Sequence, residues 1–206
     1  MSAESRCLSP NWTPTNRLRL LAAFVATAAL AVPLGSSFPD ERIIGPHGEM
    51  KHLSDFWQAG PLLLVPLASC QAQLPKVEDP RISVLGIAGQ RCNRPAVFFA
   101  PEGAPASALL LDTRGSLRRV FRAADSIPAD VRAWFDGMAV YRAQCARCHG
   151  DDGADTGYPG IRVLSGIGNR HSEGEILEMT QRAGFVDLHA LDDKARRALA
   201  DYVAGL

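Results

Sequence analysis

The sequence has no excess charge of either sign, and it lacks internal repeats and long low-complexity runs. Lysine and arginine number 22 and aspartate and glutamate also number 22, so the formal net charge of the 206 residues is zero. This balance argues against a nucleic-acid partner, because nucleic acids are bound by positively charged surfaces. Hydrophobic residues make up 47% of the chain, which is enough to bury one moderate core or two small ones.

Cysteine is also scarce, with five residues in the chain, and two of the five form a short motif. Cys145 and Cys148 are separated by two residues, and His149 follows directly. A zinc site needs four ligands, but no second cysteine pair follows, and His171 and His189 are not spaced as in a zinc finger. A redox Cys-x-x-Cys would lie between a buried strand and a helix, whereas this motif follows an amphipathic helical stretch. The pattern that remains is the one by which haem c is attached.

The chemistry of haem attachment explains the spacing. Two thiols about one helical turn apart can each add to a vinyl group of one porphyrin, while the adjacent imidazole reaches the iron. We therefore predict one covalently bound haem c, held by Cys145, Cys148 and His149. His149 is the predicted metal ligand.

From about residue 134 to residue 206 the chain resembles a small class I c-type cytochrome. The residues that carry the resemblance are Gly137-x-x-x-Tyr141-x-x-x-Cys145-x-x-Cys148-His149-Gly150, which match the first helix and haem motif of that family, and 193–203, which match its last helix. The resemblance implies an all-α domain over 130–206. It also implies that the first and last helices cross at Gly137, with aromatic residues packed over the contact.

The sequence departs from this family after Gly184. The family usually has a Met-Pro pair in this loop, whose methionine is the sixth iron ligand, but residues 185–191 contain no methionine. The remaining candidates are His189 in the loop and Met179 in the preceding predicted helix, and an empty sixth position is the third alternative. That helix is expected over 172–182, with Ser172 as its N-cap and Glu175 closing a capping box. The resemblance also implies that a proline carbonyl holds the iron-ligating histidine, and Pro159 is the candidate.

The N-terminal segment, residues 1–37, is predicted to be a signal peptide or a membrane anchor. Arg17 and Arg19 precede an uncharged run from Leu20 to Leu34, and Ala29-Leu30-Ala31 offers a small-x-small cleavage site. The uncharged stretch continues to Pro39, so an uncleaved anchor is the alternative. In both cases the rest of the chain is exported to the periplasm, which agrees with the compartment in which the resembling family receives its haem.

The middle of the chain, residues 38–123, is predicted to be a separate α/β domain. Several hydrophobic runs are bounded by turn residues, and short helical connectors are expected among them. The predicted elements are a strand at 43–44, a helix at 53–57, strands at 61–68, 81–88 and 96–99, and a hairpin over 108–121. Strands that alternate with helices indicate an α/β layer arrangement.

This segment resembles a thioredoxin-fold domain of the Sco or peroxiredoxin-like group. The residues that carry the resemblance are the helical stretch 53–56 before a hydrophobic strand, Cys70 directly after that strand, and the Leu111-Asp112-x-x-Gly115 hairpin. The family has a second cysteine soon after the first, but residues 71–75 contain none, so a copper-binding or dithiol pair is absent there. Cys92 is the partner left for Cys70, either in a structural disulfide or as a second buried thiol.

The sequence thus predicts a pared thioredoxin-like α/β domain, a short linker at 123–130 containing Pro128, and a monohaem cytochrome c domain. The expected function is one-electron transfer with redox partner proteins, including a membrane respiratory complex, and it requires no catalysis by the polypeptide. Two alternatives stay open: an assembly factor or thiol-disulfide and metal-delivery protein with a haem domain, and a haem-based redox or gas sensor.

Overall fold

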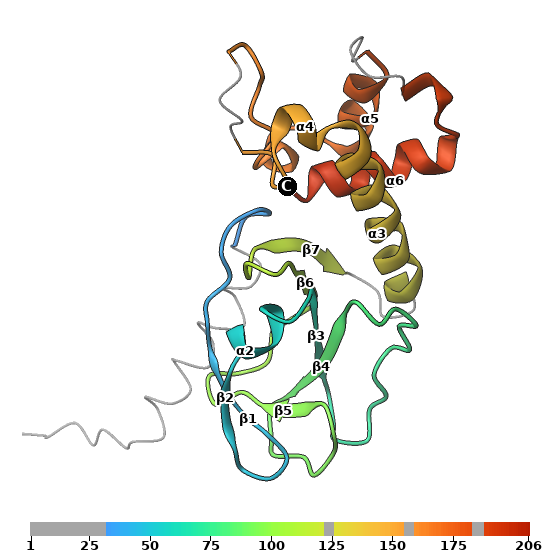
Figure 1. The fold of residues 1–206 in the computed structure, drawn as a ribbon. Coiled ribbons are helices and arrows are strands. Elements are labelled where there is room, and N and C mark those ends of the chain that lie inside the picture. The colour runs from blue at the N-terminus through green and yellow to red at the C-terminus, as the bar shows by residue number, and fades with distance from the viewer. Residues whose placement is uncertain (1–31, 122–125, 155–158, 183–187) are drawn as a thin grey trace, which may run out of the picture.

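The computed structural model describes residues 32–121, 126–154, 159–182 and 188–206. These residues form a seven-stranded sheet and a group of helices, and helix α3 runs from one to the other (Figure 1). The predicted mixture of an α/β part followed by a helical part is present.

The sheet has the strand order β2-β1-β5-β4-β3-β6-β7. β3, β4 and β5 are parallel, whereas β6 is antiparallel to β3, β7 to β6, and β1 to β5. The strands are β1 (Arg42–Ile44), β2 (Met50–His52), β3 (Leu62–Leu67), β4 (Ser83–Ala88), β5 (Val97–Phe99), β6 (Ala108–Leu111) and β7 (Leu117–Phe121). All predicted strands are found, and β2 is an additional one that pairs with β1.

The hydrophobic strand β3 lies near the centre of the sheet, and its side chains alternate between two separate cores. Leu63 and Val65 join the core on the helical side, whereas Leu62 and Leu64 join a second core that includes Trp57 of α2 (Ser54–Trp57). A strand that is buried on both faces has a continuous apolar sequence, which is why this run could be recognised.

The short helical connectors expected among the parallel strands are absent from the described chain. No helix lies between β3 and β4 or between β4 and β5, and α2 before β3 is the only helix among the described strands. Pro75 and Pro80 lie in the β3–β4 connection, and proline interrupts helical hydrogen bonding.

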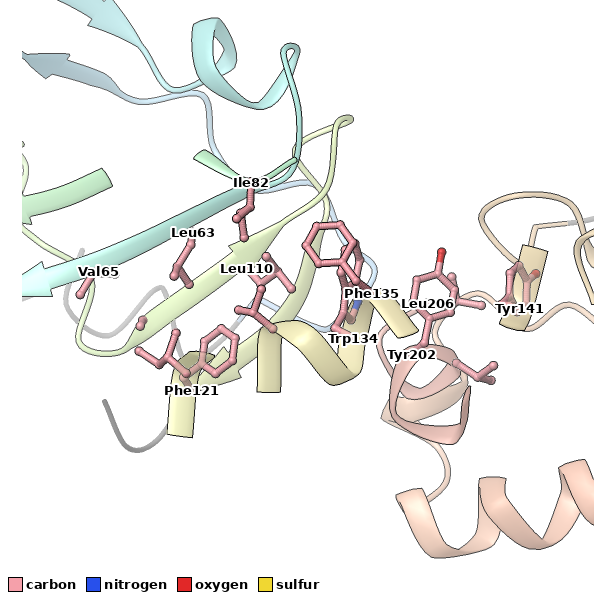
Figure 2. Packing of buried hydrophobic residues seen from close by; sticks show 14 of the residues in the cluster. Leu63, Val65, Ile82, Leu110, Phe121, Trp134, Phe135, Tyr141, Tyr202 and Leu206 are labelled. Atoms are coloured by element: carbon pink, nitrogen blue, oxygen red, sulfur yellow. The ribbon is translucent and has the colours of Figure 1, made fainter. Parts of the chain in front are cut away.

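Helix α3 (Ile127–Gln144) is where the two parts meet. Ile127, Val131, Trp134 and Phe135 are buried in the core that also contains Leu63 of the sheet (Figure 2). The predicted linker up to residue 130 is too long, because the helix already begins at Ile127. Pro at the first turn of a helix is favourable, since its missing N–H has no helical partner there.

The remaining helices follow in the C-terminal part. They are α4 (Ala146–His149), the 3-10 helix η2 (Ile167–Asn169), α5 (Glu173–Arg182), the 3-10 helix η3 (Leu188–Ala190) and α6 (Asp193–Ala204). The predicted capping box of α5 is present: Glu175 N–H donates to Ser172 Oγ at 3.3 Å, and Ser172 N–H donates to Glu175 Oε2 at 2.8 Å.

Helices α3 and α6 cross at Gly137. A Cβ atom at this position would lie 1.9 Å from the carbonyl oxygen of Ala198, so a side chain does not fit between the two backbones. The Tyr202 ring of α6 lies 5.2 Å from Tyr141 and 5.5 Å from Trp134, measured between centroids. The expected close crossing covered by aromatic residues is found.

One core cluster extends from the sheet to the end of the chain. It includes Val65 and Leu110 of the sheet, Trp134 of α3, and Tyr202 and Leu206 at the C-terminal end (Figure 2). The predicted boundary between 38–123 and 130–206 coincides with the change from strands to helices, but the hydrophobic core is continuous across it.

Most of the predicted targeting segment, residues 1–31, lies outside the described residues. Its role as a signal peptide or membrane anchor therefore stays a prediction. Its last part, however, belongs to the fold: Gly35 N–H donates to the Leu117 carbonyl at 2.7 Å, and Leu117 N–H donates to the Ser36 carbonyl at 2.9 Å. The predicted boundary at residue 37 is therefore too late. Among the described helices, none combines the length and the apolar character needed to cross a bilayer.

Candidate functional site

The Cys145-to-His149 motif is one helical turn that continues from α3. Cys145 N–H donates to the Tyr141 carbonyl at 2.7 Å, and the N–H groups of Cys148 and His149 both donate to the Cys145 carbonyl at 3.0 Å. Both thiols are free; Cys145 is partly buried and Cys148 is exposed. The helical hydrogen bonds therefore hold the two sulfurs about one turn apart, as the sequence predicted.

Burial makes the Cys145 thiol a weaker acid than an ordinary cysteine. Burial, helped by the nearby Cys148, raises the pKa of Cys145 to about 11. Cys145 is therefore a protonated thiol at neutral pH.

The imidazole of His149 is held by a backbone carbonyl. Its Nδ1 atom lies 3.0 Å from the carbonyl oxygen of Arg162, and a carbonyl can only accept, so this geometry assigns the proton to Nδ1. Nε2 is then left as the nitrogen with a free lone pair. Pro159 was the candidate for this role; the structure instead gives the contact to Arg162, three residues further along the chain.

The segment that carries Arg162 is fixed to the loop after His149. The carbonyl of Gly153 accepts hydrogen bonds from the N–H groups of Leu164, at 2.8 Å, and Ser165, at 3.0 Å. Gly153 has φ +71°, and a Cβ atom there would lie 3.0 Å from the Leu164 Cβ. Glycine is thus required both by the backbone conformation and by the close packing.

Apolar side chains are exposed on both sides of Arg162. Ile161 is 37% and Val163 47% exposed, and Met179 of α5 is 38% exposed. Only Met50, far away in β2, completes the set of exposed large hydrophobic residues in the described ranges. Ile161 and Val163 therefore expose apolar surface next to the residue whose carbonyl contacts His149.

Of the two candidates for a sixth ligand, only Met179 has a described side chain, and no described contact joins it to His149. Met179 lies in α5 and is 38% exposed. His189 is in η3, but its side chain lies outside what the structure describes.

Cys70 and Cys92 form a disulfide, with a Cα–Cα distance of 5.4 Å. It joins the loop after β3 to the loop after β4, at the carboxyl ends of two neighbouring parallel strands. The Arg94 guanidinium donates to the carbonyls of Cys70, at 2.6 Å, and Ala72, at 2.7 Å. In the described parts of the chain, no group of three or more His, Cys, Asp or Glu side chains is arranged to hold a metal ion.

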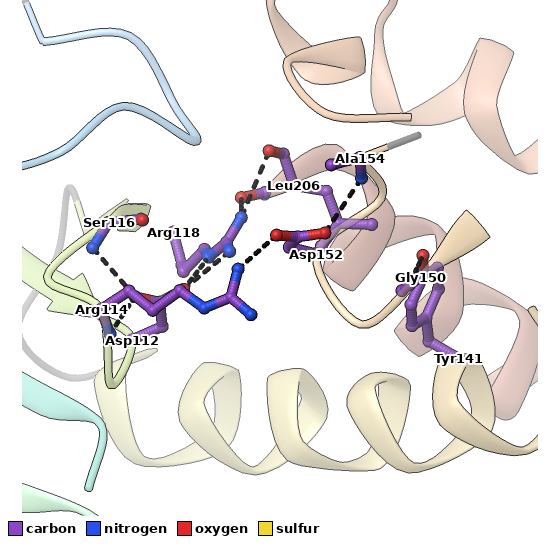
Figure 3. A network of polar contacts seen from close by, with 10 residues as sticks. Asp112, Arg114, Ser116, Arg118, Tyr141, Gly150, Asp152, Ala154 and Leu206 are labelled. Atoms are coloured by element: carbon purple, nitrogen blue, oxygen red, sulfur yellow. Dashed lines mark hydrogen bonds and ion pairs between the residues drawn. The ribbon is translucent and has the colours of Figure 1, made fainter. Parts of the chain in front are cut away.

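A polar network that no sequence pattern indicated joins the sheet to the helices (Figure 3). Arg118 of β7 is only 7% exposed and donates to Asp112 Oδ2 and to the carbonyls of Gly205 and Leu206. In the turn between β6 and β7, Arg114 forms an ion pair with Asp152, three residues after His149. Buried arginine is uncommon, but nothing in the local sequence distinguishes Arg118 from the partly exposed Arg119 that follows it.

No protein-family model matches the chain, and no curated protein matches it. Among solved structures, two from Aquifex aeolicus VF5, described as an electron transfer protein and an electron transport protein, are similar to it at 12% and 11% identity. Each similarity covers 48% of this chain and 94% of the other, with a TM-score of 0.36. A likeness at this level says nothing further about the fold or function of this chain.

Proposed function

We propose that the chain is an exported c-type cytochrome that carries one haem, bound covalently by Cys145 and Cys148 with His149 as an iron ligand, and transfers single electrons. One observation carries the proposal: directly after two free thiols on one helical turn, the His149 ring is held through Nδ1 by the Arg162 carbonyl. This arrangement leaves Nε2 available for a metal.

The residues around the motif fit a haem. Second-shell acceptance of the Nδ1 proton fixes the ring of a metal-ligating histidine and raises its basicity, which is the role of the Arg162 carbonyl. The exposed side chains of Ile161 and Val163 lie on either side of that carbonyl in the sequence and offer apolar surface to a porphyrin. A bound haem supplies an iron that alternates between the ferrous and ferric states.

The helical part supports membership of the class I cytochromes. The crossing of α3 and α6 at Gly137, with Tyr141 and Tyr202 packed beside it, is the contact that the resemblance implies. The crossing fixes the C-terminal end of α3, and the Cys145-to-His149 motif continues directly from that end.

The sheet supports a pared thioredoxin-like unit. The parallel pair β4–β3 lies beside the antiparallel pair β6–β7, as in a thioredoxin-like sheet, and Cys70 follows β3. The connection between β3 and β4 has no helix, and the cysteine that would complete a dithiol pair near Cys70 is missing. We assign this unit a supporting and docking role, not thiol chemistry.

Export completes the proposal. Residues 1–31 supply the targeting segment, and the folded chain meets redox partner proteins, including a membrane respiratory complex, in the periplasm. The motif is then loaded with haem in the compartment where Cys70 and Cys92 can be oxidised.

Covalent attachment is the decisive test. The exported chain should keep its colour after acid–acetone extraction and show haem-dependent peroxidase staining in a denaturing gel. The double variant Cys145→Ala, Cys148→Ala should lose both properties, whereas the matched control Cys70→Ser, Cys92→Ser should keep them. Haem that is fully extracted from the unsubstituted protein would overturn the proposed function.

A further inference from the structure

We propose that the turn between β6 and β7 is a clamp on the loop that follows His149, and that Arg114 is the positioning residue through which the sheet helps to orient the His149 ring. Where it concerns the haem, this inference rests on the proposed function; where it concerns the loop, it does not.

The clamp begins with a turn that is itself rigid. Asp112 Oδ1 accepts hydrogen bonds from the N–H groups of Arg114, at 2.8 Å, and Ser116, at 2.9 Å. Asp112 Oδ2 accepts from Arg118 Nε at 2.9 Å and Nη2 at 2.6 Å, and both of these partners are largely buried. Both oxygens of one carboxylate thus fix the turn that presents Arg114.

Arg114 reaches from this turn to the loop after His149. Its guanidinium pairs with Asp152 Oδ2, while Asp152 Oδ1 accepts the Ala154 N–H at 3.1 Å (Figure 3). Burial acts to raise the pKa of Asp152, but the hydrogen bonds from Ala154 and Arg114 outweigh burial and lower it. Asp152 is therefore held ionised between the hairpin and the loop.

The restraint continues from the loop to the histidine. Gly153, next to Asp152, accepts hydrogen bonds from Leu164 and Ser165, and this segment places the Arg162 carbonyl against His149 Nδ1. The path from Arg114 to the imidazole therefore consists of the ion pair to Asp152, the peptide unit to Gly153, its hydrogen bonds to Leu164 and Ser165, the backbone from Leu164 back to Arg162, and the contact of that carbonyl with the ring.

Further contacts hold the loop after His149 in place. Arg118 Nη1 donates to the carbonyls of Gly205 and Leu206, and a Cβ atom added at Gly153 would come within 3.1 Å of Leu206 Cδ1. From the opposite side, the Tyr141 hydroxyl donates to the Gly150 carbonyl at 2.7 Å. The loop after His149 is thus fixed by α3, by the end of the chain and by the hairpin turn.

The Arg114–Asp152 pair can be removed without unfolding the protein. Arg114 is 61% and Asp152 33% exposed, and ion pairs with this exposure contribute little to global stability. The variants for the test are therefore Arg114→Gln, Arg114→Lys and Asp152→Asn. Arg182→Gln is the matched control, because Arg182 is paired with Glu178 in α5 and does not touch the loop.

The first measurement is amide hydrogen exchange of residues 150–154 and 162–165 in the full chain without haem. Exchange in Arg114→Gln and Asp152→Asn should become faster by up to about fivefold, as follows when an exposed ion pair is lost from a local opening equilibrium. Arg114→Lys should restore most of the protection, and Arg182→Gln should not change it. Unchanged loop exchange in Arg114→Gln overturns the proposal.

The second measurement is the midpoint potential of the haem-loaded chain. Arg114→Gln leaves the carboxylate of Asp152 uncompensated, which favours ferric iron, so the potential should fall, while Arg114→Lys should leave it near that of the control. A lowered potential with unchanged loop exchange would show that Arg114 acts by its charge alone and would also overturn the clamp. Failure to attach haem would overturn the proposed function instead, and the exchange experiment would still decide the clamp.

Discussion

The two thiols of the Cys145-x-x-Cys148 motif have unequal environments, and this inequality predicts unequal reactivity. Only the thiolate is nucleophilic, and with a pKa of about 11 the Cys145 thiol has little thiolate near neutral pH. In the haem-free chain at about pH 8 we expect alkylation of the exposed Cys148 to be faster than that of Cys145, and the Cys145 rate to increase about tenfold per pH unit up to its pKa. Mass spectrometry of the labelled peptide follows both sites; faster labelling of Cys145 would contradict the prediction.

The disulfide between Cys70 and Cys92 is expected to stabilise the fold. It closes a loop with a sequence separation of 22 residues. In the chain-entropy treatment such a loop contributes about 3 kcal/mol to the free energy of unfolding. Urea unfolding of the double variant Cys70→Ser, Cys92→Ser should show a loss of this order, whereas Cys148→Ser, at an exposed free thiol, should change it little.

The same disulfide is not expected to catalyse thiol exchange, since no second cysteine stands near Cys70 in the sequence. An insulin reduction assay with the full chain should be negative. Turnover that is lost in Cys70→Ser would instead favour the assembly-factor alternative.

The sixth ligand of the proposed haem iron gives a further prediction. A methionine ligand raises the potential, a second imidazole lowers it, and an open position admits small ligands. We predict that the ferric protein lacks the near-infrared band of methionine-ligated haem, so that either His189 or no strong protein ligand occupies the position. His189→Ala should then convert a low-spin spectrum to high-spin; if neither His189→Ala nor Met179→Ala changes the spectrum and the ferrous form binds carbon monoxide, the position is open.

Loss of the band in Met179→Ala would show that this prediction is wrong and that Met179 is the ligand. Its 38% exposure leaves the side chain accessible for that role. The outcome would also separate simple electron transfer from the sensor alternative, because a sensor needs a position that small ligands can reach.

At the scale of elements, the crossing of α3 and α6 depends on the absence of a side chain at Gly137. In Gly137→Ala the new methyl group would lie 1.9 Å from the Ala198 carbonyl oxygen, so the helices must separate. Overpacking of this kind lowers the free energy of unfolding by about 1–3 kcal/mol. The higher helix propensity of alanine stabilises by at most about 1 kcal/mol, so a net loss is expected. Denaturant unfolding measures the loss.

The matched control is Gly174→Ala in α5, where an added Cβ atom meets nothing within 4 Å. Its stability should be unchanged or increased by up to about 1 kcal/mol, because alanine is the better helix former. Equal effects at the two glycines would contradict the close crossing.

At the scale of the whole molecule, the continuous core predicts that the helical part depends on the sheet. Ile127, Val131 and Phe135 of α3 are buried in the cluster that contains Leu63 and Leu110 of the sheet. Residues 126–206 alone would expose this face of α3 to water, so we expect them to lack fixed tertiary structure. Loss of the near-UV circular dichroism signal with retained helical far-UV signal would show this; a cooperative unfolding transition of the fragment would contradict it.

The full chain should unfold in one transition for the same reason. Circular dichroism of the helices and the fluorescence of Trp57, which is buried in the other core, should report the same midpoint in a variant whose other two tryptophans, Trp12 and Trp134, are replaced by phenylalanine. Two separate midpoints would show that the sheet and the helices are independent domains after all.

The strands, the helices and the Cys-x-x-Cys-His motif could be predicted from the amino-acid sequence, because they depend on local properties. The apolar run of β3 and the capping box of Ser172 and Glu175 are read from neighbouring residues, and the structure has them where they were predicted. The spacing of Cys145 and Cys148 within one turn follows from helical geometry alone. The crossing at Gly137 was implied by the resemblance to class I cytochromes, and the structure has it there because only a glycine permits so close a helix contact.

Contacts between residues that are distant in the chain could be identified only in the tertiary structure. The Arg162 carbonyl, not that of Pro159, reaches His149, because hydrogen bonds to Gly153 set the path of that segment. Arg114 pairs with Asp152, 38 residues away, and Arg118 donates to Gly205 and Leu206, 87 and 88 residues away. No periodicity or motif encodes contacts of that separation. The sequence therefore specified the two thiols and the imidazole of the proposed haem site, whereas only the packing of the sheet against the helices determined which backbone and side-chain groups hold that imidazole in place.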